Sequence, residues 1–149
     1  MAPVERLAFK ALTGLLPAAP RHGARPAPET GRESLRGRIR AHILEHLDDP
    51  DLTPATVAAA HYISTRSLHR LFQGQEYTVA EWIRVQRLDR CRRDLVDPSL
   101  RDRSIRAIAN RWCLTSAPHF SRAFRAAYGL SPENYRRRHY SSRSPLSLT

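Results

Sequence analysis

The sequence predicts an all-α fold of about seven helices without a sheet, and three observations lead to that prediction. Beyond residue 34, apolar side chains recur at three- and four-residue steps. Ser or Thr stands at most of the expected helix starts. No stretch alternates apolar and polar residues as a half-buried strand would. We expect helices at 34–47, 53–61, 64–75, 79–96, 104–112, 116–128 and 132–140.

The helices in the first half of this region have recognisable starts. Thr53 is a favourable N-cap with Pro54 at the first helical position, and Ser64 caps the helix that follows. The sequence Asp-Asp-Pro at 48–50 ends the first helix. That helix places apolar residues on one face at four-residue steps, namely Leu35, Ile39, Ile43 and Leu47.

The later helices are bounded in the same way. Ser104 and Ser116 are the expected N-caps of two of them, and Gly129 supplies a stop before the last helix, which begins at Pro132 behind Ser131. Asp-Pro at 97–98 closes the long helix, whose apolar positions are Trp82, Ile83, Leu88, Cys91 and Leu95.

The chain before residue 34 has a different character. Residues 3–16 allow one short helix, and 17–31 are rich in Pro and Gly, as is typical of a flexible linker. We therefore expect a folded body that starts near Ser34. The expected organisation is an N-terminal helix and linker at 1–33, a first subdomain at 34–78, a linker helix at 79–96, a second subdomain at 97–140 and a disordered tail at 141–149.

Positive charge is concentrated near the C-terminus. The formal net charge is +11, and residues 101–149 hold ten basic and two acidic side chains, against eleven and ten in 31–100. Such a surplus favours a polyanionic partner. A high-GC genome explains why 24 of the 25 basic residues are Arg, but it does not explain their uneven distribution.

Two cysteines, Cys91 and Cys113, are too few for a disulfide framework, and Cys91 is expected in the core. No apolar run reaches the roughly 18 residues of a membrane span, so we expect a cytoplasmic, nucleoid-associated protein without a membrane partner.

A repeat at a spacing of 52 residues indicates function. Leu68-His69-Arg70-Leu71-Phe72 aligns with Phe120-Ser121-Arg122-Ala123-Phe124, and Val57-Ala58 aligns with Ile108-Ala109. Each copy predicts a short helix, a tight turn and a capped helix. This is the helix-turn-helix pattern, in which the second helix enters the major groove of DNA.

Helical spacing separates the two sides of each second helix. In the first copy, Leu68, Leu71 and Phe72 face inward; in the second, Phe120, Ala123, Phe124 and Ala127 do. Side chains on the outer side include Arg, His, Gln and Ser, which bond with base edges or phosphates. With the residues at the helix starts, the candidate DNA-binding residues are Ser64, Thr65, Arg66, His69, Arg70, Gln73, Ser116, Ala117, Pro118, Ser121, Arg122 and Arg125.

The segment 64–72 and the run from His119 through Arg136 resemble the AraC/XylS family of bacterial transcription regulators. The resemblance covers about residues 35–139. It implies two helix-turn-helix (homeodomain-like) subdomains joined by the long helix 79–96, with two recognition helices in successive major-groove faces of an asymmetric site. Its base-reading positions fall on Arg66, His69 and Arg70, and on Ala117, Pro118, Ser121 and Arg122.

The chain departs from the family pattern at several positions. Tyr62 and Cys113 stand in the two turns where the family usually has Gly, so both turns are expected to be either strained or differently shaped. Glu76 stands where a Gly commonly follows the first recognition helix, and Leu114 where Phe is preferred. Few residues precede the DNA-binding part, so the chain is either a truncated product, which we favour, or a short stand-alone member.

Other chemistry is poorly supported. His42 and His46 lie one turn apart without the Glu order of a zinc protease, and two cysteines without a second pair do not indicate structural zinc. We expect no enzyme, no cofactor and no metal. The leading hypothesis is a sequence-specific regulator that binds double-stranded DNA as a monomer or weak homodimer and contacts RNA polymerase in some contexts. The alternatives are a non-specific basic nucleic-acid-binding protein and a truncated, degenerate regulator fragment.

Overall fold

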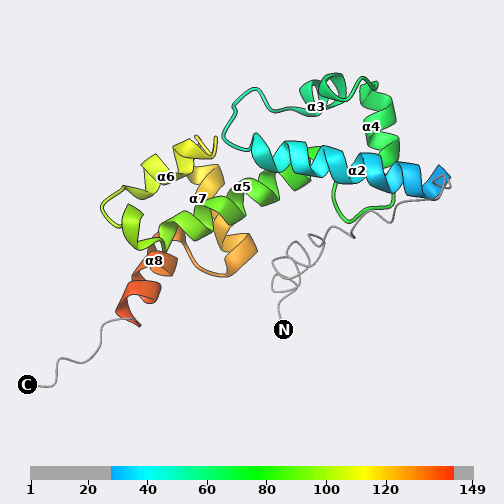
Figure 1. Ribbon diagram of the computed structural model, residues 1–149. Coiled ribbons are helices and arrows are strands. Elements are labelled where there is room, and N and C mark those ends of the chain that lie inside the picture. The colour runs from blue at the N-terminus through cyan, green and yellow to red at the C-terminus, as the bar shows by residue number, and fades with distance from the viewer. Residues whose placement is uncertain (1–27, 143–149) are drawn as a thin grey trace, which may run out of the picture. The chain divides into compact units, whose positions relative to one another are not determined.

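The computed structural model describes residues 28–142, and this part of the chain is all-α. It contains seven α-helices, one short 3₁₀ segment and no strand, so the predicted fold class is confirmed (Figure 1). The predicted helix at 3–16, most of the linker and the tail beyond residue 142 lie outside the described residues. In chain order the elements are α2 (Pro28–Glu45), α3 (Pro54–Ala60), α4 (Thr65–Leu71), α5 (Val79–Leu95), η1 (Pro98–Leu100), α6 (Ile105–Arg111), α7 (Ala117–Tyr128) and α8 (Pro132–Ser141).

Helix α2 begins at Pro28, not near Ser34, so this part of the linker prediction is wrong. Proline is well tolerated in the first turn, where its missing N–H would have no intrahelical partner. Gly31 lies inside the helix and costs about 1 kcal/mol there, which is too little to end it.

Helix α4 ends at Leu71, earlier than the predicted Gln75. Phe72 is the C-cap, and Gly74 takes a left-handed conformation with φ of 79°. The sequence comparison with the family placed the Gly-preferring position at Glu76, but Gly74 is the residue that turns the chain. A glycine here costs little because it has no Cβ to oppose positive φ.

Four helices are capped by a hydroxyl as predicted. The side-chain oxygens of Thr53, Ser64, Ser104 and Ser131 each accept a hydrogen bond from the backbone N–H three residues later, at 3.0–3.2 Å. Ser116 occupies the N-cap position of α7, but its side chain makes no cap hydrogen bond, so that prediction is wrong in its chemistry. Its ψ of 105° differs from the 151–163° of Thr53, Ser64, Ser104 and Ser131.

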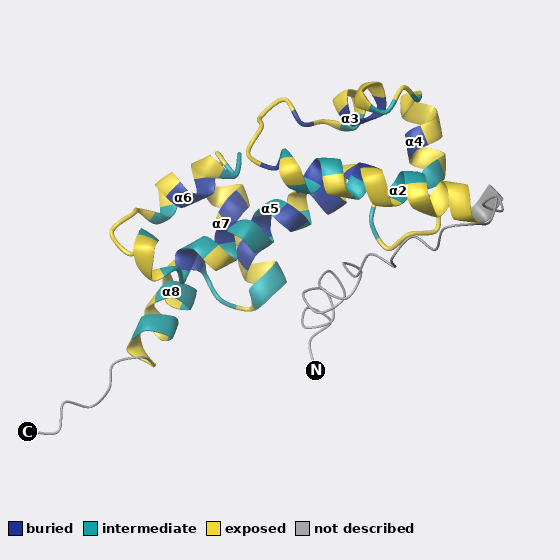
Figure 2. Cartoon of the chain, in the orientation of Figure 1, coloured by how far each residue is buried: buried dark blue, intermediate teal, exposed yellow. Residues whose placement is uncertain are grey.

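The described residues divide into two compact units, 28–87 and 88–142, and each has its own buried core (Figure 2). The predicted inward face of α5 is confirmed, because Trp82, Ile83, Leu88, Cys91 and Leu95 are all buried. The core of 88–142 is formed by Leu88, Cys91, Leu95, Ile108, Ala109, Phe120 and Phe124. In 28–87 the buried apolar side chains are Ile39, Ile43, Leu47, Leu52, Val57, Ala58, Leu68, Phe72, Val79, Trp82 and Ile83.

Each unit contains the helix-turn-helix that the repeat predicted, and each turn has a left-handed residue where the family resemblance implied one. Tyr62 has φ of 56° and Cys113 has φ of 61°, and they are the non-glycine residues with positive φ in the described part of the chain. Ile63 N–H donates to Ala58 at 3.0 Å, and Leu114 N–H donates to Ala109 at 2.9 Å. These aligned bonds close the first part of both turns in the same way, and the second turn then has one residue more before the N-cap of its next helix.

Two loops are held by arginine side chains that bind backbone carbonyls. Arg87 donates to the carbonyls of Leu47 and Asp49 at 2.8 and 2.7 Å, in the segment before α3. Arg136 donates to three carbonyls before α6, those of Leu100, Arg101 and Arg103, at 2.6–2.8 Å. Part of the positive charge therefore serves the fold itself, because a guanidinium offers five donors in a fixed fork.

Replacing Ser104 and Ser116 by Ala measures what the hydrogen bond of an N-cap contributes to stability, because the first side chain makes that bond and the second does not. We expect Ser104→Ala to lower the free energy of unfolding by about 1 kcal/mol, because the N–H of Ala107 loses its acceptor. Ser116→Ala is the matched control and should cost much less. Urea unfolding of both variants measures the difference, and equal losses would contradict the assigned caps.

The strained turn of the first unit offers a stabilising substitution. Tyr62→Gly should raise the free energy of unfolding by about 0.5–1 kcal/mol, since relief of positive φ exceeds the extra chain entropy of Gly. The ring is 97% exposed, so little packing is lost with it. Tyr62→Ala removes the ring but keeps the Cβ and should leave stability nearly unchanged. A similar gain in both variants would point to the ring rather than to the backbone.

Candidate nucleic-acid interface

The second helix of the first helix-turn-helix, α4, buries one side and exposes the other. Leu68 is fully buried and Phe72 nearly so, whereas Arg66, His69 and Arg70 are exposed. Ser64 and Thr65 at the start of the helix are exposed as well. Gln73 is also exposed, but it lies beyond the end of α4 rather than on the helical face where it was predicted. The structure thus brings five of the six candidates together at one short helix and its cap.

Two arginines of α2 hold the C-terminal end of α4. Arg36 Nε donates to the carbonyl of Leu71 at 3.2 Å, where the helix has no further N–H to offer. Arg40 lies over two rings, with its guanidinium carbon 5.9 Å from the centre of Phe72 and 5.7 Å from that of Trp82. Burial, with a smaller contribution from Arg36, lowers the pKa of Arg40.

These two arginines were missed by sequence reasoning. Arg36 bonds with Leu71 and Arg40 donates to Gln75 Oε1 at 3.0 Å, and each of these hydrogen bonds spans 35 residues. Their spacing of one helical turn places them on the same side of α2, which is the one local signal that they act together. They position α4 through its C-terminal end and are not candidates for direct base contact.

The second helix of the second helix-turn-helix, α7, follows the same plan. Phe120 and Phe124 are buried, and their rings meet edge to face at 5.7 Å between centroids. Arg122 is exposed and lies 3.4 Å, Nη2 to Nδ1, from His119 one turn earlier. All the predicted residues of this unit are exposed: Ser116, Ala117, Pro118, Ser121, Arg122 and Arg125.

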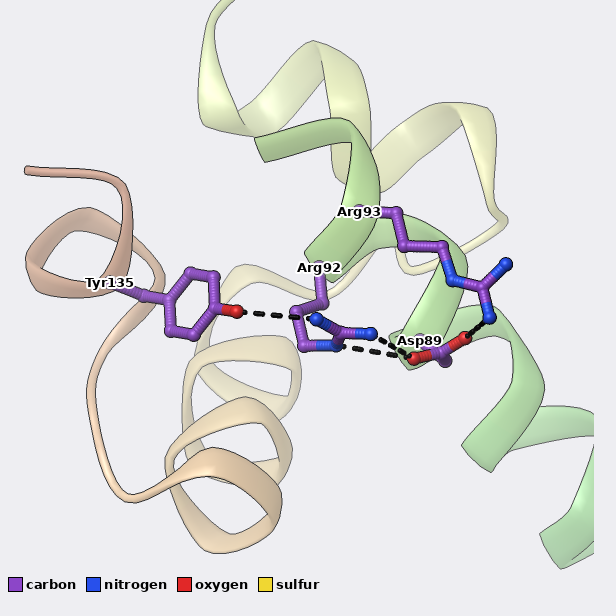
Figure 3. A network of polar contacts seen from close by, with 4 residues as sticks. All are labelled: Asp89, Arg92, Arg93 and Tyr135. Carbon is purple, nitrogen blue, oxygen red and sulfur yellow. Dashed lines mark hydrogen bonds and ion pairs between the residues drawn. The ribbon is translucent and has the colours of Figure 1, made fainter. Parts of the chain in front are cut away.

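A polar network fixes α8 against the rest of this unit (Figure 3). Asp89 forms ion pairs with Arg92 at 2.8 Å and with Arg93 at 2.9 Å, and Arg92 donates to the hydroxyl of Tyr135 at 3.3 Å. Burial opposes the charge of Arg92, yet hydrogen bonds to Tyr135 and Asp89 hold its pKa above the ordinary value. The ring of Tyr135 packs edge to face on the ring of Phe124, with 5.5 Å between the ring centroids, so the network supports the buried side of α7.

Burial also changes two titratable groups in the same unit. It raises the pKa of Tyr128 to about 12, with the nearby Asp89 carboxylate acting in the same direction. It raises the pKa of the Cys91 thiol to about 12, with a further contribution from Asp94. Cys91 is fully buried, which confirms its predicted place in the core.

Three histidine rings of the first unit lie close together. The ring of His42 stacks on that of His46, with 4.2 Å between centroids, and meets the ring of His61 edge to face, with 5.1 Å between centroids. No three His, Cys, Asp or Glu residues within 28–142 are arranged to hold a metal ion. No helix in this range is long and apolar enough to cross a membrane.

Known proteins share both the sequence pattern and the fold. A family model described as a helix-turn-helix domain matches residues 57–138. The transcriptional activator NphR of a Rhodococcus species is 32% identical over 136 residues, which are 91% of this chain. The chain spans 38% of the length of NphR, well under half of it.

Two solved structures are similar as well. The DNA-binding domain of AdpA, a global transcriptional factor solved in complex with a target DNA, is 28% identical with a TM-score of 0.63, over 73% of this chain and 95% of that one. A transcriptional regulator with an AraC-type DNA-binding domain from Chromobacterium violaceum shares the fold, with a TM-score of 0.65 at 24% identity over 73% of this chain and 95% of that one. The chain belongs to the AraC-type family of helix-turn-helix DNA-binding transcription regulators.

Proposed function

We propose that this chain recognises a specific duplex sequence by placing α4 and α7 in successive major-groove faces of an asymmetric DNA site. The observation that carries the proposal is the pair Arg70 and Arg122. They occupy aligned positions on two helices, both are exposed, and each helix is backed by a buried aromatic residue, Phe72 or Phe124. A guanidinium in the major groove bonds in a bidentate manner with O6 and N7 of guanine.

The remaining exposed side chains of α4 and α7 differ in chemistry. The first helix offers hydrogen-bonding groups from Arg66 and His69, whereas the second begins with Ala117 and Pro118, which suit thymine methyl groups and local DNA shape. Ser121 adds one hydroxyl to the second helix. Two unlike helices require two unlike half-elements, which is why the proposed site is asymmetric.

We also propose that residues 34–78 and 97–140 act as the two DNA-binding subdomains, connected by the helix at 79–96. The protein then binds DNA as a monomer or weak homodimer, in the cytoplasm at the nucleoid. Since the two recognition helices come from one chain, a second copy is not needed to fill both half-elements. Contact with RNA polymerase then depends on where the site lies relative to a promoter.

Selection of bound duplexes from a random pool at near-physiological salt tests the proposal. We expect one motif with two dissimilar elements about 10 base pairs apart, which is one helical turn. A salt titration of the selected duplex against random DNA measures specificity. No enrichment, with binding that weakens equally on every duplex as salt rises, would overturn the proposal in favour of a non-specific basic protein.

Alanine substitution of the paired arginines tests their role in reading bases. Arg70→Ala or Arg122→Ala should each cost about 1–3 kcal/mol on the selected site and relax base preference at one position. Arg32→Ala, an exposed arginine on α2, is the control and should change neither affinity nor preference. Equal loss on every sequence would mean that Arg70 and Arg122 bind phosphate only.

A further inference from the structure

The first helices of the two helix-turn-helix units, α3 and α6, carry different charge. Alignment through the capping residues Thr53 and Ser104 pairs Ala55 with Arg106 and Ala60 with Arg111. Helix α3 thus contains no charged residue, whereas α6 contains two arginines. All four paired side chains are exposed, so the difference lies on the surface and not in the core.

The segments before these helices differ in the same sense. Asp49 and Asp51 are exposed in the loop before α3, while Arg101 and Arg103 are exposed before α6. Over the whole units, residues 28–87 hold eight arginines and eight carboxylate side chains, and residues 88–142 hold twelve and five. The first unit is therefore electrically balanced, and the second is strongly cationic.

Several cations of the second unit already have acidic partners. Arg92 and Arg93 pair with Asp89, Arg137 pairs with Glu133 at 2.8 Å, and Arg111 lies 3.7 Å from Asp94. Arg106 makes no ion pair with any described residue and is exposed. Among the arginines of α6, Arg106 is consequently the one whose full charge is available to an external anion.

In helix-turn-helix docking the second helix lies in the groove, and the first crosses the sugar-phosphate backbone. A basic first helix therefore gains from counterion release, and an uncharged one does not. We propose that the two units divide the electrostatic part of the binding energy: residues 88–142 anchor the protein to DNA phosphates through α6 and Arg106 in addition to the base contacts of α7, and residues 28–87 contribute base discrimination with little electrostatic attraction. This inference rests on the proposed function, since it assumes that both units dock on one duplex.

Reciprocal substitutions at one aligned position test the division in the full chain. Arg106→Ala should reduce the slope of log affinity against log salt by about 0.9, the value for one phosphate contact, and weaken binding to the selected and random duplexes by the same factor. Ala55→Arg places the missing charge on α3 and should steepen the slope by about 0.9 while strengthening binding to both duplexes equally. Arg32→Ala is again the control and should leave the slope unchanged.

Each outcome is decisive because both positions are exposed and thermal unfolding verifies that the variants fold. An unchanged slope in Arg106→Ala would overturn the anchor, as would a loss confined to the selected duplex, which would make Arg106 a base-reading residue. An unchanged slope in Ala55→Arg would show that α3 does not approach the backbone as α6 does. Failure of the proposed function is distinguishable from failure of this division, because selection from the random pool would then return no motif, whether or not the salt slopes change.

Discussion

The second helix of each helix-turn-helix depends on the burial of one face. Helix α4 has seven residues, and an isolated helix of that length is unstable in water because nucleation costs more than its few hydrogen bonds return. Its shape is maintained by Leu68 and Phe72 in the core, by the Ser64 cap at one end and by Arg36 at the other. The positions of the exposed side chains of α4 therefore depend on these four contacts.

Arginine has two different roles in this chain. Some arginines complete the fold, because Arg36, Arg87 and Arg136 bind backbone carbonyls of loops and helix ends, and Arg40 covers the rings of Phe72 and Trp82. Lysine could not replace them, since its single ammonium group lacks the planar fork of donors. Net charge alone consequently overstates the number of cations that face DNA.

Much of the fold was predictable from sequence because its signals are local. Periodicity identified seven helices, hydroxyl residues marked four true caps, and the family resemblance located the left-handed residues Tyr62 and Cys113 in the two turns. The errors have local causes as well: Gly74 ends α4 early, and Pro28 opens α2 where proline suggested a linker.

For the candidate site, sequence predicted exposure correctly at the nine positions assigned to the outer faces but misplaced Gln73 on the helical face. What sequence could not show was support from a distance. The bond from Arg36 to Leu71 spans 35 residues, and that from Arg92 to Tyr135 spans 43, so neither leaves a spacing signal. The missing side-chain bond of Ser116 likewise depends on its backbone angles rather than on its identity.

Comparison of the two repeats shows which constraints the fold imposes and which it leaves open. Aligned buried positions keep their apolar character, as in Val57 with Ile108 and Leu68 with Phe120. Aligned exposed positions differ in chemistry: Thr65 corresponds to Ala117, Arg66 to Pro118 and His69 to Ser121. On the exposed face of the two helices, the pair that is identical is Arg70 with Arg122.

Arg70 and Arg122 are both exposed, so core packing does not require them to be the same residue. Core packing makes the two units equivalent in shape, and shape alone would allow them to bind equivalent DNA elements. The different outer faces, together with the uncharged α3 and the basic α6, remove that equivalence. In the proposed binding mode, the two units of the same fold serve unequal parts of one site, which a symmetric pair of identical chains could do only by tolerating mismatched contacts in one half.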